Sequence, residues 1–208
     1  MTDIIVETSS DSPEARAVFE GLAAEYDIRY RVPGGPPRTV ESEIAAYPPP
    51  LFTPPLGVFL VLRRGDRTIA GGAFMSHDDE TVEFKRIWTH PDLRRQGLAA
   101  RILAALEARA VGLGYVRAYL TTGFRQPEAM ALYRRYGFRP LFDPSADPAL
   151  YRSLPFEKPL AEGLAPGPFR HPAATPDQAD AVVTAIKAAQ AERILARLAR
   201  HQQQRETA

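Results

Sequence analysis

Apolar residues recur with two different periods along this chain, and the changes of period predict alternating strands and helices. A short strand is expected at residues 4–6, and Ser12-Pro13 opens a helix in which apolar side chains recur every three or four residues. A β-hairpin follows over residues 57–74 with its turn at Gly65-Asp66, and a third strand covers residues 81–89. The N-terminal half is therefore predicted to be a strand, a helix and three strands.

A helical period returns after residue 97. Its apolar face holds Leu98, Ile102, Leu106, Ala110 and Leu113. The helix should end near Gly112, and a strand from Tyr115 completes a β–α–β unit with parallel strands. A shorter helix from Gln126-Pro127 precedes two short strands near Phe138 and residues 152–157. The predicted order is β-α-β-β-β-α-β-α-β-β, within an α/β (α+β) fold class.

Proline positions divide the chain, because proline is excluded from helix interiors and central strands. Of 20 prolines, eight lie between Pro33 and Pro55 and nine between Pro140 and Pro176. We expect a proline-rich loop in the first interval and three parts overall. These are a domain over 1–160, a Pro/Gly-rich linker over 161–175 and a helical tail over 176–204. The tail could dock on the domain, form a homodimer or extend into solvent.

Composition narrows the function classes. The chain of 208 residues is 45% hydrophobic, which is enough to bury a core, and it has no cysteine, which excludes disulfides, thiolate metal sites and a cysteine nucleophile. Four scattered histidines form no ligand cluster, so no metal is expected. With no signal-like start and no long apolar stretch, we expect a cytoplasmic protein. A net charge of +1 argues against general binding to nucleic acid or membrane.

The segment 90–100 joins a strand to a helix N-terminus and has the features of an anion site. Unpaired N–H groups and the positive end of the helix dipole meet there, and Gly97 and Ala99 add no bulk. Arg94 and Arg95 add positive charge. The glycine patterns of dinucleotide-binding and P-loop proteins are absent, so a different phosphate loop is indicated.

This segment resembles the cofactor motif of the GNAT superfamily of acetyl-CoA-dependent N-acetyltransferases. The family pattern Arg/Gln-x-x-Gly-x-Gly/Ala is matched by residues 94–99, and residues 85–91 are similar to its fourth strand. A second block over 126–138 resembles the pattern Asn-x-x-Ala-x-x-Leu-Tyr-x-x-x-Gly-Phe, with Gln126 in place of the asparagine. The similarity covers about residues 3–158.

The resemblance implies a mixed, mostly antiparallel splayed sheet flanked by helices, with acetyl-CoA (coenzyme A) bound where two strands separate. Backbone groups of Ile87, Trp88 and Thr89 would pair with pantetheine, while Gln126 stands where the family contacts that arm. The pyrophosphate site would be formed by Arg94, Arg95, Gln96, Gly97, Leu98, Ala99 and Ala100. The acceptor would enter from the opposite side, past the first helix and the proline-rich loop with Tyr47 and Phe52.

Two residues are candidates for catalysis. Tyr133 shares a helical face with apolar neighbours and could be a core tyrosine, but the family match implies a proton donor to the leaving thiolate. Strand alternation places Glu83, Lys85, Ile87 and Thr89 on one face. Glu83 could therefore be a cross-strand ion-pair partner or the general base that deprotonates the acceptor.

The leading hypothesis is an enzyme that moves an acetyl group from acetyl-CoA to a primary amine of a small molecule or peptide by direct attack in a ternary complex. A non-catalytic coenzyme-A-binding regulatory module is one alternative. A nucleic-acid-binding protein is another, because residues 93–139 hold nine arginines against two glutamates. However, the chain has 23 arginines and only 3 lysines, so arginine is its ordinary surface cation.

Overall fold

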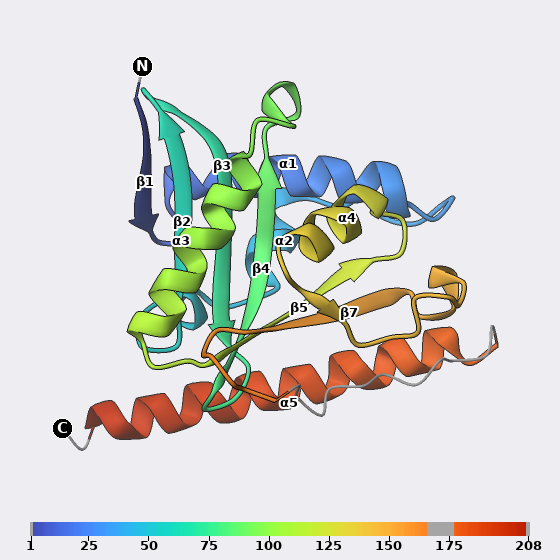
Figure 1. Cartoon of the computed structure of the whole chain (residues 1–208). Coiled ribbons are helices and arrows are strands. Elements are labelled where there is room, and N and C mark those ends of the chain that lie inside the picture. Colours follow the sequence, from blue (N-terminus) through green and yellow to red (C-terminus); the bar gives the residue numbers. More distant parts are fainter. Residues whose placement is uncertain (1, 166–176, 207–208) are drawn as a thin grey trace. The chain divides into compact units, whose positions relative to one another are not determined.

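The computed structural model describes residues 2–165 and 177–206 (Figure 1). The chain forms two compact units. The first unit comprises Met1–Met75 and Val82–Tyr115, and the second comprises Ser76–Thr81 and Val116–Ala208. The predicted linker lies largely outside the described residues, as do Thr175 and Pro176 of the predicted helix start.

The first unit is built on four neighbouring strands, β1 (Asp3–Thr8), β2 (Gly57–Arg64), β3 (Arg67–Ser76) and β4 (Thr81–Thr89), in that order. β1 and β3 both run antiparallel to β2. The hairpin turn lies at Gly65-Asp66 as expected, and Gly65 has a φ of +60°, which glycine adopts without strain.

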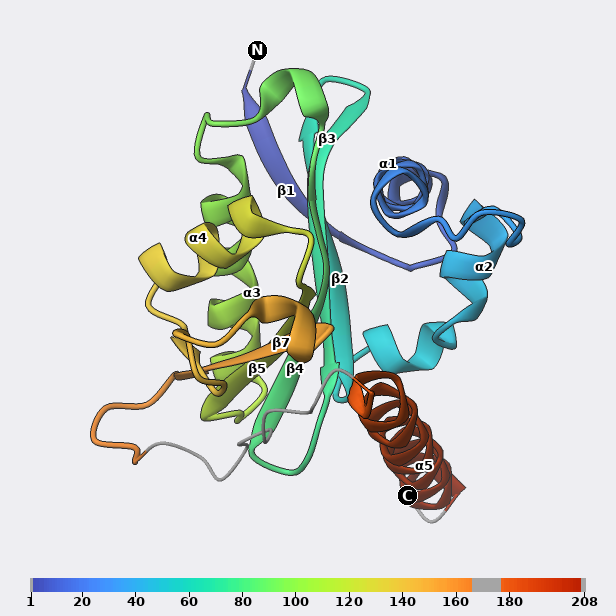
Figure 2. The same cartoon turned by 90° about the vertical axis from the view of Figure 1, so that its right-hand side faces the viewer.

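Two long helices cover opposite faces of these strands, as Figure 2 shows. α1 (Pro13–Tyr30) begins at Ser12, whose side chain accepts a hydrogen bond from the Ala15 N–H. α3 (Leu98–Gly112) buries Leu98, Ile102, Leu103, Leu106 and Ala110. Adjacent glycines of β3 permit both approaches, because a Cβ at Gly71 would meet Val18 of α1 and one at Gly72 would meet residues of α3.

The proline-rich segment is not simply a loop, and this part of the prediction was wrong. It contains α2 (Val40–Ala45) and a short 3₁₀ helix (Pro49–Phe52). Thr39 and Ser42 cap α2 reciprocally, each side chain accepting a hydrogen bond from the other residue's N–H. The prolines lie on either side of α2 and therefore do not interrupt it.

The second unit contains β5 (Arg117–Gly123), α4 (Pro127–Arg135), β6 (Arg139–Pro140), β7 (Ser153–Pro159) and α5 (Ala179–Glu206). The strands pair antiparallel in the order β5-β7-β6. Asp180 and Arg197 of α5 form ion pairs with Arg152 (3.2 Å) and Asp79.

The predicted order of strands and long helices is confirmed, and so is the fold class, mixed α/β with mostly antiparallel strands flanked by helices and an additional C-terminal helix. Within the described ranges, no helix is long and apolar enough to cross a membrane.

Candidate active site

The opening of α3 has the backbone geometry expected of an anion site. Gly97 is the N-cap with a φ of +77°, and Arg95 also lies in the left-handed region with a φ of +64°. A Cβ built at Gly97 would meet no atom within 4 Å, and residues 94–97 are exposed. The first turn carries no acidic side chain, so the positive end of the 15-residue helix is not neutralised there. Buried Leu98 anchors the helix start to the core.

The two arginines of this loop differ in their surroundings. An Arg94 Nη2 lies 2.8 Å from Glu25 Oε2 of α1, so this guanidinium is already in an ion pair. The exposed Arg95 side chain forms no hydrogen bond or ion pair with any residue that the structure describes. Arg95 is therefore the better placed of the two to meet a phosphate.

The remaining arginines of the basic segment are also largely paired. Arg101 pairs with Asp3 (2.8 Å) and Arg109 with Glu7, while Arg117 and Arg139 share Glu157. With Arg94, five of the nine arginines in residues 93–139 hold carboxylates of their own unit. This pairing weakens the nucleic-acid alternative, because paired guanidinium groups are less available to phosphates.

β4 contains a local irregularity at Arg86, which has a φ of +61°. As a result, two consecutive cations contact the same ring, with Lys85 Nζ 5.2 Å and Arg86 Cζ 5.3 Å from the centroid of Tyr47. Regular strand alternation would have placed them on opposite faces.

The prediction that Glu83, Lys85, Ile87 and Thr89 share one face was therefore wrong beyond the irregularity. A Cβ at Gly72 would meet Ile87 together with Ile102 and Leu106, so Ile87 lies on the α3 side. Trp88 instead packs against Gly21 of α1. Thr89 Oγ1 is buried and has no hydrogen-bond partner among the described residues.

Glu83 is almost fully buried, with 2% of its surface exposed. Its Oε1 lies 2.6 Å from Lys85 Nζ, so an ion-pair partner comes from the same strand rather than from a neighbouring one. Burial lowers the pKa of the Lys85 ammonium, but the Glu83 carboxylate and the Tyr47 hydroxyl outweigh this effect and the pKa is raised. Lys85 is therefore charged at neutral pH.

A second buried ion pair, which the sequence did not predict, lies beside the first. Glu43 of α2 accepts hydrogen bonds from Arg86, both to its carboxylate and, at 2.6 Å, to its backbone carbonyl. Arg38 lies 3.3 Å from the other carboxylate oxygen of Glu43. The Arg86 guanidinium also lies 5.4 Å from the Phe19 ring centroid. Arg86 of β4 therefore contacts both α2 and α1, and it directly follows Lys85 of the Lys85–Glu83 pair.

The remaining predicted site residues lie in the second unit. Tyr133 of α4 is 7% exposed, and its ring lies 5.9 Å from those of Phe138 and Phe156. Gln126 precedes α4, and its Oε1 accepts hydrogen bonds from Thr122 Oγ1 and the Gly123 N–H, both at 3.1 Å. Any contact of Gln126 with a cofactor would therefore use its amide NH₂ group.

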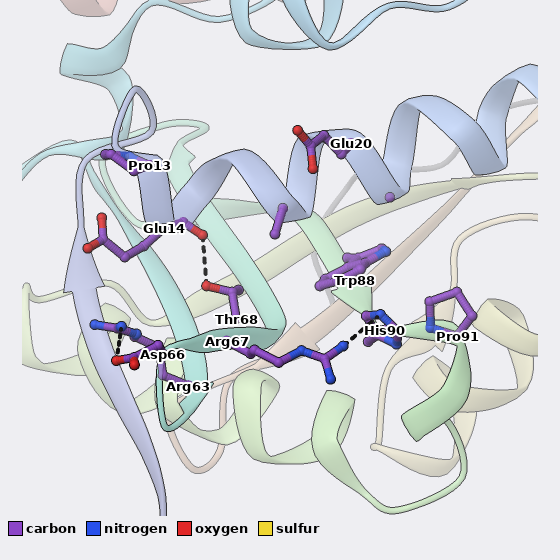
Figure 3. Close-up of a pocket in the computed structure, with 12 residues that line it drawn as sticks. Pro13, Glu14, Glu20, Arg63, Asp66, Arg67, Thr68, Trp88, His90 and Pro91 are labelled. Carbon is purple, nitrogen blue, oxygen red and sulfur yellow. Dashed lines mark hydrogen bonds and ion pairs between the residues drawn. The ribbon is translucent and has the colours of Figure 1, made fainter.

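A pocket of about 560 Å³ opens in the first unit between α1, the β2–β3 hairpin and the end of β4 (Figure 3). Its polar walls include Arg67 Nη2, 3.5 Å from His90 Nε2, and Thr68 Oγ1, which donates a 2.9 Å hydrogen bond to the Glu14 carbonyl. Of the residues predicted for the site, the lining contains only Trp88. Within the described residues, no group of histidine, aspartate and glutamate side chains could hold a metal ion.

Comparisons with known proteins identify a matching family and similar chains. The model of the acetyltransferase (GNAT) family matches residues 18–138. An IAA acetyltransferase from Azospirillum brasilense is 35% identical over 105 residues, which cover 49% of this chain and 67% of that protein.

Solved structures show the same fold. A Klebsiella pneumoniae protein described as an acyl-CoA N-acyltransferase is 26% identical with a TM-score of 0.59, over 77% of this chain and 99% of that chain. The PaiA N-acetyltransferase of Thermoplasma acidophilum, in complex with coenzyme A, is 13% identical with a TM-score of 0.58, over 76% and 99%. YncA of Salmonella typhimurium, solved with acetyl-CoA, is 17% identical with a TM-score of 0.57, over 81% and 99%.

Proposed function

Because this chain belongs to the acetyltransferase (GNAT) family, we propose that it transfers an acetyl group from acetyl-CoA to a primary amine of a small molecule or peptide. The amine would attack the thioester directly in a ternary complex. The observation that carries the proposal is the opening of α3, where Gly97 and Arg95 in left-handed conformations leave an exposed helix N-terminus without an acidic side chain. Structural relatives that contain coenzyme A or acetyl-CoA support it.

The residues present fit acetyl-CoA at several positions. Backbone N–H groups from Arg95 to Ala100 would hold the pyrophosphate, and the exposed Arg95 side chain would add a charge-assisted contact. The buried Thr89 Oγ1 still has hydrogen-bonding capacity within the described part of the chain. Backbone groups of Ile87, Trp88 and Thr89 and the amide of Gln126 would bind the pantetheine arm.

Two proton transfers accompany the reaction, and each has a candidate residue. Glu83 would accept the proton that the acceptor ammonium must lose before its nitrogen can attack. The nitrogen then bonds to the thioester carbonyl carbon, and the carbon–sulfur bond breaks as the tetrahedral adduct collapses. Tyr133 would donate its phenolic proton to the departing thiolate, whose basicity is similar to its own. The products are an N-acetylated amine and coenzyme A.

The test is acetyl-CoA turnover with a broad panel of amines. Thiol release would be measured together with the mass of the products formed from acetyl-CoA that carries an isotope-labelled acetyl group. We expect the labelled acetyl group to be attached to the nitrogen of at least one class of amine. Tight acetyl-CoA binding with no transfer across the panel would instead favour the regulatory module. Steeply salt-dependent binding to a mixed DNA duplex, without acetyl-CoA binding, would favour the nucleic-acid alternative.

A further inference from the structure

We infer that Lys85, held by Tyr47, is a positioning residue that keeps the buried Glu83 carboxylate ionised. This inference rests on the proposed function, in which Glu83 accepts a proton from the acceptor amine. It assigns roles to two residues that do not themselves react. It also gives the proline-rich segment, which supplies Tyr47, a part in the proton transfer.

The contacts form a chain from the segment after α2 to the proposed base. Lys85 Nζ lies 2.6 Å from Glu83 Oε1, and the Glu83 carboxylate and the Tyr47 hydroxyl together raise the pKa of Lys85. The Lys85 ammonium also lies over the Tyr47 ring, 5.2 Å from its centroid. Lys85 is 14% exposed and Glu83 is 3% exposed in their side chains, so bulk water screens this pair poorly.

Lys85 rather than Arg86 pairs with Glu83, because the Arg86 guanidinium is bound to Glu43. Arg86 lies on the same ring of Tyr47, but its guanidinium is bound to the carboxylate and carbonyl of Glu43. Glu43 is also paired with Arg38. Burial raises the pKa of Tyr26 of α1, so its hydroxyl stays neutral. The nearby charges act on that pKa in opposite directions: Arg86 and Lys85 lower it, and Glu43 and Glu25 raise it. The surrounding charges are thus largely neutralised among themselves.

This arrangement addresses a conflict in the chemistry of a buried base. A carboxylate removed from water tends to bind a proton, and a protonated Glu83 could not accept one from the acceptor. An adjacent ammonium favours the ionised form. When Glu83 becomes protonated during the reaction, the ammonium of Lys85 keeps its contact with the Tyr47 ring. The proton goes from the acceptor nitrogen to a Glu83 oxygen, and Lys85 neither gains nor loses one.

The test measures the ionisation of Glu83 directly, in the full-length protein without acetyl-CoA. The glutamates are labelled with ¹³C at the side-chain carboxyl carbon and observed by NMR. The resonance that is missing from the spectrum of Glu83→Gln identifies Glu83. Lys85→Met removes the charge but keeps the aliphatic stem, while Lys85→Arg is the matched control that keeps a cation. Tyr47→Phe keeps the ring and removes the hydroxyl.

We expect the Glu83 resonance to titrate about one pH unit or more higher in Lys85→Met than in the wild type, the usual scale for losing an adjacent opposite charge. Lys85→Arg should stay near the wild type, and Tyr47→Phe should shift in the same direction as Lys85→Met by a smaller amount. An unchanged titration in Lys85→Met would overturn the inference. If Lys85→Met does not fold, an unchanged titration in Tyr47→Phe overturns the assigned role of Tyr47.

Turnover separates this inference from the proposed function. In Lys85→Met the acidic limb of the pH–rate profile should shift to higher pH by about as much as the titration of the Glu83 resonance does. The rate should recover at high pH. If the resonance shifts but Glu83→Gln keeps the wild-type pH–rate profile, Glu83 is not the base. That result would contradict the positioning role while leaving acetyl transfer intact. No transfer in the wild type with a shifted resonance would contradict the proposed function itself.

Discussion

The indole ring of Trp88 lies so close to Gly21 of α1 that a Cβ atom at Gly21 would come within 2.0 Å of its Nε1. Trp88 is 5% exposed, so neighbouring residues cover most of its surface. Glycine inside a helix is unfavourable relative to alanine by about 1 kcal/mol. Close packing of the end of β4 on α1 is therefore the structural reason for glycine at this position.

Gly21→Ala should destabilise the protein by about 1–3 kcal/mol, because overpacking outweighs the gain in helix propensity. Gly112→Ala is the matched control, since a Cβ there meets no atom within 4 Å and the residue also lies in a helix. It should be neutral or stabilise by up to about 1 kcal/mol. Urea denaturation of both variants tests the contact, and equal stabilities would show that Trp88 yields without cost.

Tyr133→Phe should lower turnover by ~10²-fold or more, because it removes the proton proposed for the departing thiolate while keeping the ring. The affinity for acetyl-CoA and the melting temperature should change little, since packing on Phe138 and Phe156 is retained. Single-turnover kinetics would ensure that the chemical step is observed. Near-full turnover would leave Tyr133 as a core tyrosine only.

Asp3→Asn should reduce the loss of stability at acid pH. The hydrogen bond from Arg64, together with Arg101, holds the pKa of Asp3 at about 2, well below its usual value. A depressed pKa stabilises the folded state above about pH 4, and this contribution is lost as pH falls toward 2. Asp66→Asn at the exposed hairpin turn is the control. Denaturation at a series of pH values should show a shallower decline for Asp3→Asn alone.

Removal of residues 177–208 should lower the melting temperature of the protein by a few degrees or convert a dimer to a monomer, because α5 is tied to its own unit through Arg197 and Asp79. Arg197→Ala should reproduce part of any loss, and Arg193→Ala, at an exposed position of the same helix, should not. Sedimentation and thermal melts measure both effects. An unchanged melting temperature and an unchanged oligomeric state would identify α5 as a solvated extension.

Local sequence patterns were sufficient for the order of elements but not for contacts between distant segments. The apolar periods and Ser12-Pro13 predicted α1, the hairpin and α3, since each pattern lies within the element it describes. α2 was not predicted, because the many prolines around it indicated a loop. Thr39 and Ser42 nevertheless cap a short helix there. The pairing of Arg94 with Glu25 joins residues 69 positions apart, and local spacing carries no signal for it.

In the candidate site, too, local features were predicted from the sequence and contacts between distant segments were not. The motif around Gly97 predicted an exposed helix N-terminus, and the structure has one. Strand alternation failed at Arg86, because a positive φ in a non-glycine residue has no marker in the sequence. The neighbourhood of Lys85, Tyr47 and Glu43 follows from that irregularity and appeared only with the structure. The roles of Tyr133 and Glu83 in proton transfer stay predictions.

The most direct test of the account is the binding of acetyl-CoA to a matched pair of variants at Gly97, measured by calorimetry. Asparagine and aspartate both tolerate the left-handed conformation better than other side chains and are nearly equal in shape, so Gly97→Asn and Gly97→Asp differ mainly in one negative charge. If the pyrophosphate lies at the opening of α3, Gly97→Asp should bind acetyl-CoA at least about tenfold more weakly than Gly97→Asn, a difference of about 1.4 kcal/mol. Equal affinities in two folded variants would contradict the placement of the cofactor and the function proposed from it.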